Sequence, residues 1–257
     1  MLTPTSQQRL GVRNRPDEPP LIQQTWENLL FAHWACDPDA VQRTLPPQLR
    51  VETWHGRAYV GVIPFYARNT RLRLASPVPL VSDFYELNVR TYVHDRNGTP
   101  GVWFYSLDCS QALAVAGARV AYSLPYYPAV VSTEQLVGNS VRYTCQREGQ
   151  PRASEFRYTV GEALGQAAAE TLEFFLIERY YLFSRSLAGR VYSARVWHQP
   201  YSLFKAQLGR WDDEMLRVNG LGAFTDQPAH VIFSKGVDVD IHAPHELASQ
   251  EPVVWRA

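Results

Sequence analysis

Apolar and polar residues alternate along many short stretches of the chain, and a period of two is typical of β-strands whose faces meet different environments. These stretches are rich in β-branched and aromatic residues, and they are separated by Gly, Pro, Asn and Asp, which favour turns. The predicted strands are residues 21–35, 50–67 (a hairpin that turns at His55-Gly56), 84–93, 102–107, 119–124, 140–146, 155–160, 190–198, 201–208 and 231–241. Short connections favour antiparallel neighbours, so the pattern predicts a mostly antiparallel sheet.

A period of three and four residues runs through residues 165–187 instead. Leu172, Phe175 and Tyr180 follow this spacing, which predicts one long amphipathic helix packed against the sheet. The alanine-rich residues 110–118 predict a second, short helix. Strands together with such helices indicate the α+β fold class.

The domain organisation follows from composition. Residues 1–20 are polar and proline-rich, which predicts a flexible N-terminal arm. Predicted strands lie on both sides of the long helix, and no linker follows the arm. We therefore expect residues 21–257 to form a single domain.

The predicted strand at residues 84–93 carries most of the candidate chemistry. Alternation places Phe84, Glu86, Asn88, Arg90 and Tyr92 on one face, and it leaves the opposite face mainly apolar. A solvated outer face would explain this mixture of charges, an amide and aromatic rings. A ligand pocket with aromatic walls and a few convergent polar groups explains it equally well.

Charge and composition narrow the choice of partners. The formal net charge is zero and the pI is about 7.1, which argues against nucleic acid or an anionic membrane surface as a partner. Three widely spaced cysteines without a CxxC pair fit a reduced protein, and neither a signal peptide nor a transmembrane stretch is visible. We expect a cytoplasmic protein that binds a small molecule, and a homo-oligomer stays open.

A metal site is conceivable near the end of the chain. Asp238, Asp240 and His242 share a face of the last predicted strand, and carboxylates and imidazoles are metal ligands. Such spacing also arises by chance in an alternating strand, so we predict neither a metal nor another cofactor.

Several motifs, in order along residues 26–241, resemble the YqjF-like family of uncharacterised bacterial proteins within the acetoacetate decarboxylase superfamily. They are Phe31-x-His33-Trp34, Leu45-Pro46, WHGRAYVGVIPF at 54–65, FYELNVRTYV at 84–93, GVWFYSLD at 101–108, Ala118-Arg119 and Leu124-Pro125-Tyr126. The resemblance implies a curled sheet or partly closed β-barrel around a central cavity.

One departure from the superfamily governs the functional interpretation. The decarboxylases carry adjacent lysines after the x-Pro motif, and one of them forms a Schiff base. Tyr126 and Tyr127 occupy those positions here, and a phenol cannot form an imine. The chain has two lysines, Lys205 and Lys235, and alternation leaves it open whether Lys205 points inward.

The candidate roles follow from these residue types. Glu86 is the candidate general acid or base, Arg90 or Arg119 would bind an anionic group, and Tyr126 would donate a hydrogen bond or a proton. The catalytic candidates are therefore Glu86, Tyr126 and Arg119, and the ligand-binding candidates are Arg90, Asn88, Tyr127, His33 and Tyr105.

Two classes of function fit this site. The protein is either an enzyme that acts on small carboxylate or carbonyl compounds without a Schiff-base lysine, or a non-catalytic ligand-binding or sensing module on the same fold. Resemblance of fold alone does not establish catalysis.

Overall fold

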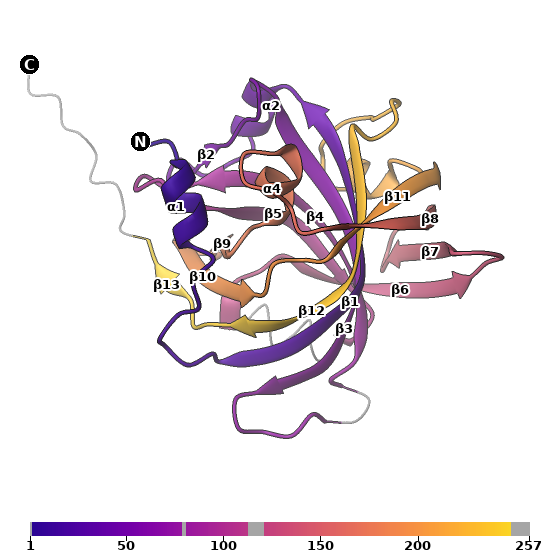
Figure 1. Ribbon diagram of the computed structural model, residues 1–257, viewed down its shortest axis with the longest axis horizontal. Helices are drawn as coiled ribbons and strands as arrows, with labels where there is room; N and C mark the ends of the chain where they lie inside the picture. Colours follow the sequence, from indigo (N-terminus) through magenta and orange to yellow (C-terminus); the bar gives the residue numbers. More distant parts are fainter. Residues whose placement is uncertain (1, 79–80, 113–120, 248–257) are drawn as a thin grey trace, which may run out of the picture.

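The computed structural model describes residues 2–78, 81–112 and 121–247 (Figure 1). Its strands are β1 (Ile22–Cys36), β2 (Arg50–Val51), β3 (Ala58–Leu72), β4 (Phe84–His94), β5 (Pro100–Cys109), β6 (Tyr126–Gln135), β7 (Ser140–Arg147), β8 (Ser154–Gly165), β9 (Tyr181–Arg185), β10 (Val191–His198), β11 (Leu203–Arg210), β12 (His230–Ile241) and β13 (His245–Glu246). They form one 13-stranded sheet in the order β13-β10-β9-β5-β6-β7-β8-β11-β12-β1-β3-β4-β2. The pairs that β5 makes with β6 and β9 are parallel, and the other pairs are antiparallel, as the sequence predicts.

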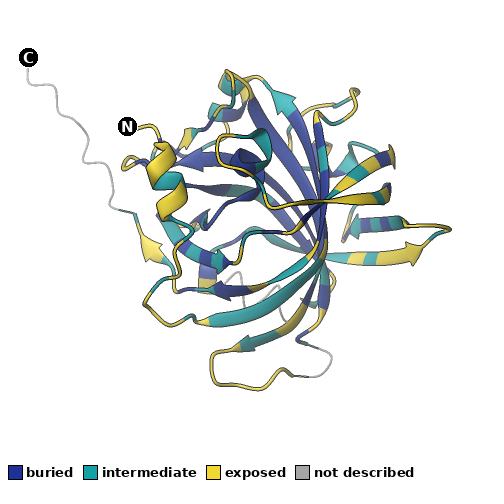
Figure 2. Ribbon diagram, in the orientation of Figure 1, coloured by how far each residue is buried: buried dark blue, intermediate teal, exposed yellow. Residues whose placement is uncertain are grey.

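Two further pairings close the sheet on itself. β4 pairs with β5, which completes a circuit through β6, β7, β8, β11, β12, β1 and β3. β10 pairs with β12, which completes a second circuit through β9, β5, β4, β3 and β1. The two circuits share β12, β1, β3, β4 and β5, so both faces of these shared strands look into an interior. Figure 2 shows β4 and its neighbours as largely buried strands.

Alternation divides the side chains of each shared strand between two hydrophobic cores. In β4, Leu87 and Val89 belong to a core formed with β7, β8 and β11. Phe84 and Tyr92 belong to the other core, which includes residues of α4, β9 and β10. The polar residues between Phe84 and Tyr92 therefore point into the second circuit. Of the two interpretations that the sequence left open, a solvated face and an enclosed one, the structure has the enclosed face.

The predicted hairpin at residues 84–107 is also confirmed. β4 and β5 pair antiparallel from Glu86 to His94. In the connecting turn, Oδ1 of Asp95 accepts hydrogen bonds from the backbone N–H groups of Asn97 and Thr99, each at 2.9 Å. Gly98 has a φ of +81°, a conformation that glycine adopts without a steric penalty.

The long helix predicted at residues 165–187 is wrong. β8 continues to Gly165, and α4 (Leu172–Ile177) is followed after three residues by β9. Four residues of α4 are buried, and the charged pair that follows it, Glu178 and Arg179, is buried as well. The apolar spacing reflects a short helix and a strand buried on most sides, which can imitate one long amphipathic helix.

The other helices of the domain are short. α2 (Pro38–Gln42) begins at Asp37, which accepts a hydrogen bond from the N–H of Asp39. α5 spans Glu214–Arg217. The helix predicted at 110–118 lies mostly outside the described residues. The strand predicted at 119–124 is wrong where it is described, because residues 121–122 are helical and β6 begins at Tyr126.

The N-terminal segment makes contacts that the sequence did not predict. It contains α1 (Ser6–Gly11), and three of its arginines lie within 4 Å of carboxylates of the domain. Arg9 pairs with Glu52 at 3.0 Å and Arg15 pairs with Asp240 at 2.7 Å. Figure 1 shows α1 lying against the end of the sheet near β9 and β10. In the described part of the chain, no helix has the length and apolar character needed to cross a membrane.

Candidate functional site

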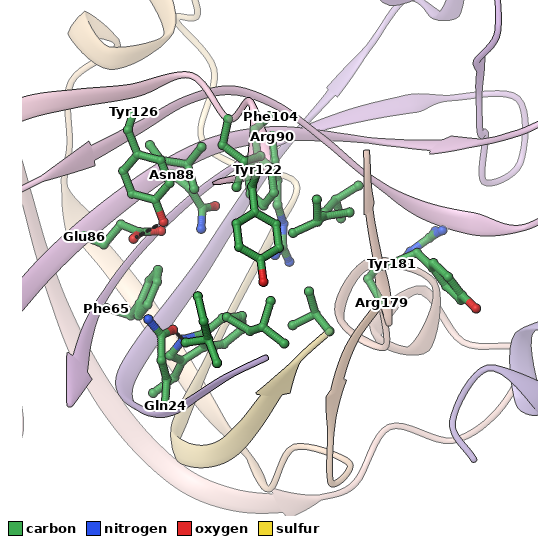
Figure 3. Close-up of a pocket in the computed structure, with 18 of the residues that line it drawn as sticks. Gln24, Phe65, Glu86, Asn88, Arg90, Phe104, Tyr122, Tyr126, Arg179 and Tyr181 are labelled. Atoms are coloured by element: carbon green, nitrogen blue, oxygen red, sulfur yellow. Dashed lines mark hydrogen bonds between the residues drawn. The ribbon is translucent and has the colours of Figure 1, made fainter. Parts of the chain in front are cut away.

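The second circuit encloses a cavity of about 230 Å³ (Figure 3). Residues of β1, β3, β4, β5, β9, β10 and β12 line it, together with the segments around Tyr122 and Arg179. Its wall is mainly apolar and aromatic. The polar side chains of the lining are those of Gln24, Thr70, Glu86, Asn88, Arg90, Tyr122, Tyr126, Arg179, Tyr181 and Tyr201, along with the indole of Trp26.

Glu86 and Tyr126 meet because of the strand register. Glu86 pairs with Cys109 on β5, and Tyr126 at the start of β6 pairs with Leu107, two residues away on the same strand. The Tyr126 hydroxyl donates a hydrogen bond of 3.0 Å to Oε2 of Glu86. Both residues line the cavity, as the sequence analysis expected of this pair.

The Glu86 carboxyl is only 4% exposed, and this burial changes its acidity. Desolvation raises the pKa of Glu86 from 4.5 to about 8, although hydrogen bonds from Tyr126 and Asn88 lower it in part. Burial also raises the pKa of the Tyr126 phenol well above its usual value of 10. At neutral pH the cavity therefore holds a protonated carboxyl beside a phenol that stays protonated.

Arg90 is a buried cation that no acidic side chain of the described residues neutralises. Its Nε donates to the hydroxyl of Tyr92 at 3.3 Å, and its guanidinium lies over the rings of Phe31 and Tyr92. Among the described residues no carboxylate lies within 4 Å of it, and its Nη2 has no hydrogen-bond partner. A buried charge without a partner is costly, so this group is suited to bind an anion.

Arg179 is a second cavity arginine, and the sequence analysis missed it. Its Nη1 donates to Oε2 of Glu52 at 2.6 Å and its Nε donates to the carbonyl of Phe175 at 2.6 Å. Its Nη2 is buried without a partner in the part of the chain that is described. The available signal was the pair Glu178-Arg179 inside the apolar run 174–183, because charges in such a run need buried partners.

His33 lies behind the cavity wall and not in its lining. Its Nε2 is 2.6 Å from the Tyr92 hydroxyl, and its Nδ1 is 3.0 Å from Nδ1 of His230. Burial lowers the pKa of His33 well below 6.5, and the charges of His230 and Arg90 lower it further. The ring is therefore neutral, and it supports Tyr92, which in turn holds Arg90.

Three other predicted site residues are not placed in this cavity. Tyr127 lies under the guanidinium of Arg147, with 4.0 Å from Cζ to the ring centroid. Tyr105 has its hydroxyl 2.8 Å from that of Thr44. Tyr105 and Tyr127 line an outer hollow, whose lining shares Phe104, Leu124 and Tyr126 with the cavity. Arg119 lies outside the described residues.

Neither lysine of the chain reaches the cavity. The Lys205 side chain is 62% exposed and pairs with Glu162 on the outer face of β8 and β11. Lys235 is exposed and lies over the ring of Phe204. Cys109 packs near Glu86, but burial raises the pKa of its thiol to about 12, so it is not a thiolate nucleophile at neutral pH.

Asp238, Asp240 and His242, which the sequence offered as possible metal ligands, do not form a common site in the structure. Asp238 accepts a hydrogen bond from Thr25, and Asp240 binds Arg15. Within residues 2–78, 81–112 and 121–247, no group of three or more His, Cys, Asp or Glu side chains is arranged to hold a metal ion.

Solved structures with similar folds include an enduracididine biosynthesis enzyme and acetoacetate decarboxylases. The enduracididine biosynthesis enzyme MppR, complexed with pyruvate, matches with a TM-score of 0.64 and 17% identity over 91% of this chain and 93% of that one. Acetoacetate decarboxylase from Legionella pneumophila matches with a TM-score of 0.64 and 12% identity over 90% and 89%. An acetoacetate decarboxylase-like enzyme from Sphingomonas wittichii RW1 matches with a TM-score of 0.62 and 14% identity, over 90% of this chain and 94% of that one. These identities show the fold alone.

Sequence comparison gives the family. The uncharacterized protein YqjF of Bacillus subtilis (strain 168) is 34% identical over 193 residues, which cover 75% of this chain and 78% of that protein. The model of the DUF2071 family, an uncharacterized conserved protein, matches residues 23–238. The chain therefore belongs to the DUF2071 family, with YqjF, and has the acetoacetate decarboxylase-like fold that the sequence motifs predicted.

Proposed function

We propose that the protein is an acid–base enzyme that acts on a small carbonyl compound bearing a carboxylate, and that it works without an imine. The observation that carries this proposal is the buried Glu86 carboxyl, which lies in the cavity with its pKa raised to about 8 and is hydrogen-bonded by Tyr126. A group whose pKa is near the working pH is suited to both accept and return a proton.

The proposed step is removal of a proton from the carbon next to the carbonyl. The ionised form of Glu86 takes this proton, and the electron pair of the C–H bond moves onto the carbonyl oxygen. Once Glu86 is protonated, the Tyr126 hydroxyl can turn its hydrogen bond to the developing enolate oxygen. Return of the proton from Glu86 completes the cycle, and no external reagent is consumed.

Arg90 supports the choice of a carboxylate-bearing substrate. Its unpartnered Nη2 and its lack of an acidic partner among the described residues favour binding of an anion. Two structural neighbours are consistent with this class, since one is complexed with pyruvate and another is named an acetoacetate decarboxylase.

A non-catalytic ligand-binding module is the second candidate. It is favoured by the mainly apolar and aromatic wall of the cavity, which suits retention of a ligand as well as its conversion. In that case Glu86 would serve as a hydrogen-bond donor alone.

Hydrogen–deuterium exchange at the α-carbon separates the two candidates. A panel of keto acids would be incubated with the protein in D2O and followed by NMR, with Glu86→Gln as the test variant and Glu162→Gln, which alters an exposed carboxylate, as the matched control. We expect enzyme-dependent exchange that Glu86→Gln abolishes and Glu162→Gln retains. Binding without exchange in the wild-type protein would support the ligand-binding module and contradict the enzyme.

A further inference from the structure

The polar groups of the cavity lie at two ends that the β4 strand holds apart. Glu86 and Arg90 point into the cavity from the same face of β4, four residues from each other. Four residues of an extended strand span about 13 Å. Figure 3 shows Glu86 beside Tyr126 on one side of the cavity and Arg179 near Tyr181 on the opposite side.

The Arg90 side chain points away from Glu86, so its length does not bring the guanidinium group closer to the Glu86 carboxyl. Its Cζ lies 5.6 Å from the centroid of the Tyr92 ring, two residues farther along the strand. The Cζ of Arg179 lies 5.0 Å from the same centroid. Both guanidinium groups therefore lie beside the Tyr92 ring, and Arg90 and Arg179 together are called the cationic end below.

Electrostatic effects agree with this separation. The charge of Arg90 acts on His33, His198 and Tyr201. The charge that acts on Glu86 comes from Asp108, on the neighbouring strand β5. Glu86 and the cationic end are thus affected by different charged groups, although they lie in one cavity.

The cationic end carries an excess of positive charge. Arg9 and Arg179 share the single carboxylate of Glu52, while Arg90 has no carboxylate within 4 Å among the described residues. Nη2 of Arg90 and Nη2 of Arg179 are both buried without partners in the described part of the chain. One ligand carboxylate that accepted from both would satisfy these donors.

Much of the cavity wall is apolar. Phe104, Val102, Leu182, Val196 and Ile177 line the cavity, and they offer no hydrogen bonds to a ligand. A ligand that reaches both ends must therefore have an apolar body.

We propose that the ligand is an elongated carboxylate, with its anionic group at Arg90 and Arg179, an apolar middle, and its carbonyl at Glu86 and Tyr126. This inference rests on the proposed function for the place of the carbonyl. A keto acid as short as pyruvate or acetoacetate would reach one end only, so we expect it to bind weakly.

A homologous series of straight-chain methyl-ketone acids, from acetoacetate to oxodecanoate, tests the inference by calorimetry and by exchange next to the ketone. We expect affinity to rise with chain length to an optimum well beyond acetoacetate. The methyl ester of the best acid should bind at least about tenfold more weakly, and this comparison needs no variant that must fold.

Variants then identify the cationic end. Arg90→Met should weaken the best acid by about tenfold or more and remove the difference between acid and ester, while Arg90→Lys should restore part of the affinity. Arg152→Met, at an exposed arginine in the β7–β8 turn, is the matched control. It should change neither the affinity for the best acid nor the difference between acid and ester.

The outcomes separate this inference from the proposed function. Tightest binding and fastest exchange with the shortest acids would overturn the elongated ligand and leave the acid–base role of Glu86 standing. Equal affinity for acid and ester would overturn the cationic end. Tight binding of the long acids without exchange would retain the ligand class and contradict the proposed catalysis.

Discussion

The Tyr126 hydroxyl donates a hydrogen bond of 3.0 Å to the carboxyl of Glu86, inside a cavity that removes both groups from water. This bond favours the ionised form of Glu86 and so lowers its pKa, against the larger effect of burial. The pair thus holds the pKa of Glu86 nearer to neutral pH than burial alone would.

Tyr126→Phe should therefore raise the pKa of Glu86 above about 8, because the variant removes a donor to the carboxylate and keeps the ring. The pH profile of α-carbon exchange should shift to higher pH, and exchange at pH 7 should fall. Tyr105→Phe, which removes a hydroxyl from the outer hollow, should leave the profile unchanged. An unshifted profile in Tyr126→Phe would show that this hydrogen bond does not tune Glu86.

Glu86 should also make stability depend on pH. The folded protein keeps a proton that an unfolded glutamate releases above its ordinary pKa of 4.5, so this stabilisation is complete below pH 4.5 and is lost as pH rises through about 8. The full effect is on the order of 5 kcal/mol. Glu86→Gln cannot titrate, so its free energy of unfolding in urea should fall less than that of the wild-type protein between pH 5 and pH 8. Parallel pH profiles of the two proteins would rule out a raised pKa.

Asp108 and Arg147 form a buried arginine–carboxylate pair. Nε and Nη2 of Arg147 donate to the two oxygens of Asp108 at 2.6 and 2.9 Å, and the Asp108 side chain is 0% exposed. Arg147→Met should destabilise the protein by about 3–5 kcal/mol, because it leaves a buried carboxylate without its partner.

The matched control for that change is Arg157→Met. Arg157 pairs with Glu155 at the surface, with 42% of its side chain exposed, and such pairs contribute about 1 kcal/mol or less. Urea denaturation of both variants gives the comparison. Losses of similar size would contradict the importance assigned to burial of Asp108.

The sequence was informative where local rules decide the structure. Alternation predicted β4 and β5, and it placed Glu86 and Arg90 on one face of β4. These features depend on neighbours within a few residues, so a single sequence contains the signal. By contrast, a strand was predicted to end before Pro125, whereas β6 begins at Tyr126.

Long-range partners account for what the sequence did not predict. Arg179 reaches the cavity because Glu52, more than a hundred residues earlier, holds its guanidinium. The segment around Arg179 was assigned to a long helix, since a buried helix followed by a buried strand gives an apolar spacing similar to that of a helix face. Double closure of the sheet, through β4–β5 and β10–β12, has no local signal either.

Trapping with borohydride should give no covalent adduct with ketones or keto acids. Imine formation needs a primary amine held in the cavity, and both lysines lie on the exterior. Intact-mass measurement after reduction would detect an adduct. A stoichiometric adduct at Lys205 or Lys235 that abolished activity would contradict the assignment of chemistry to Glu86.

The most direct test of the acid–base account is the pKa of Glu86 itself. The side-chain carboxyl carbon of 13C-labelled glutamate reports ionisation by NMR, and the Glu86→Gln variant identifies the signal that belongs to Glu86. The account predicts that this signal titrates with a midpoint near pH 8, as burial of the carboxyl requires. A midpoint near 4.5, the ordinary value for glutamate, would mean that the carboxyl is fully ionised at neutral pH, and it would contradict the proposed role of Glu86.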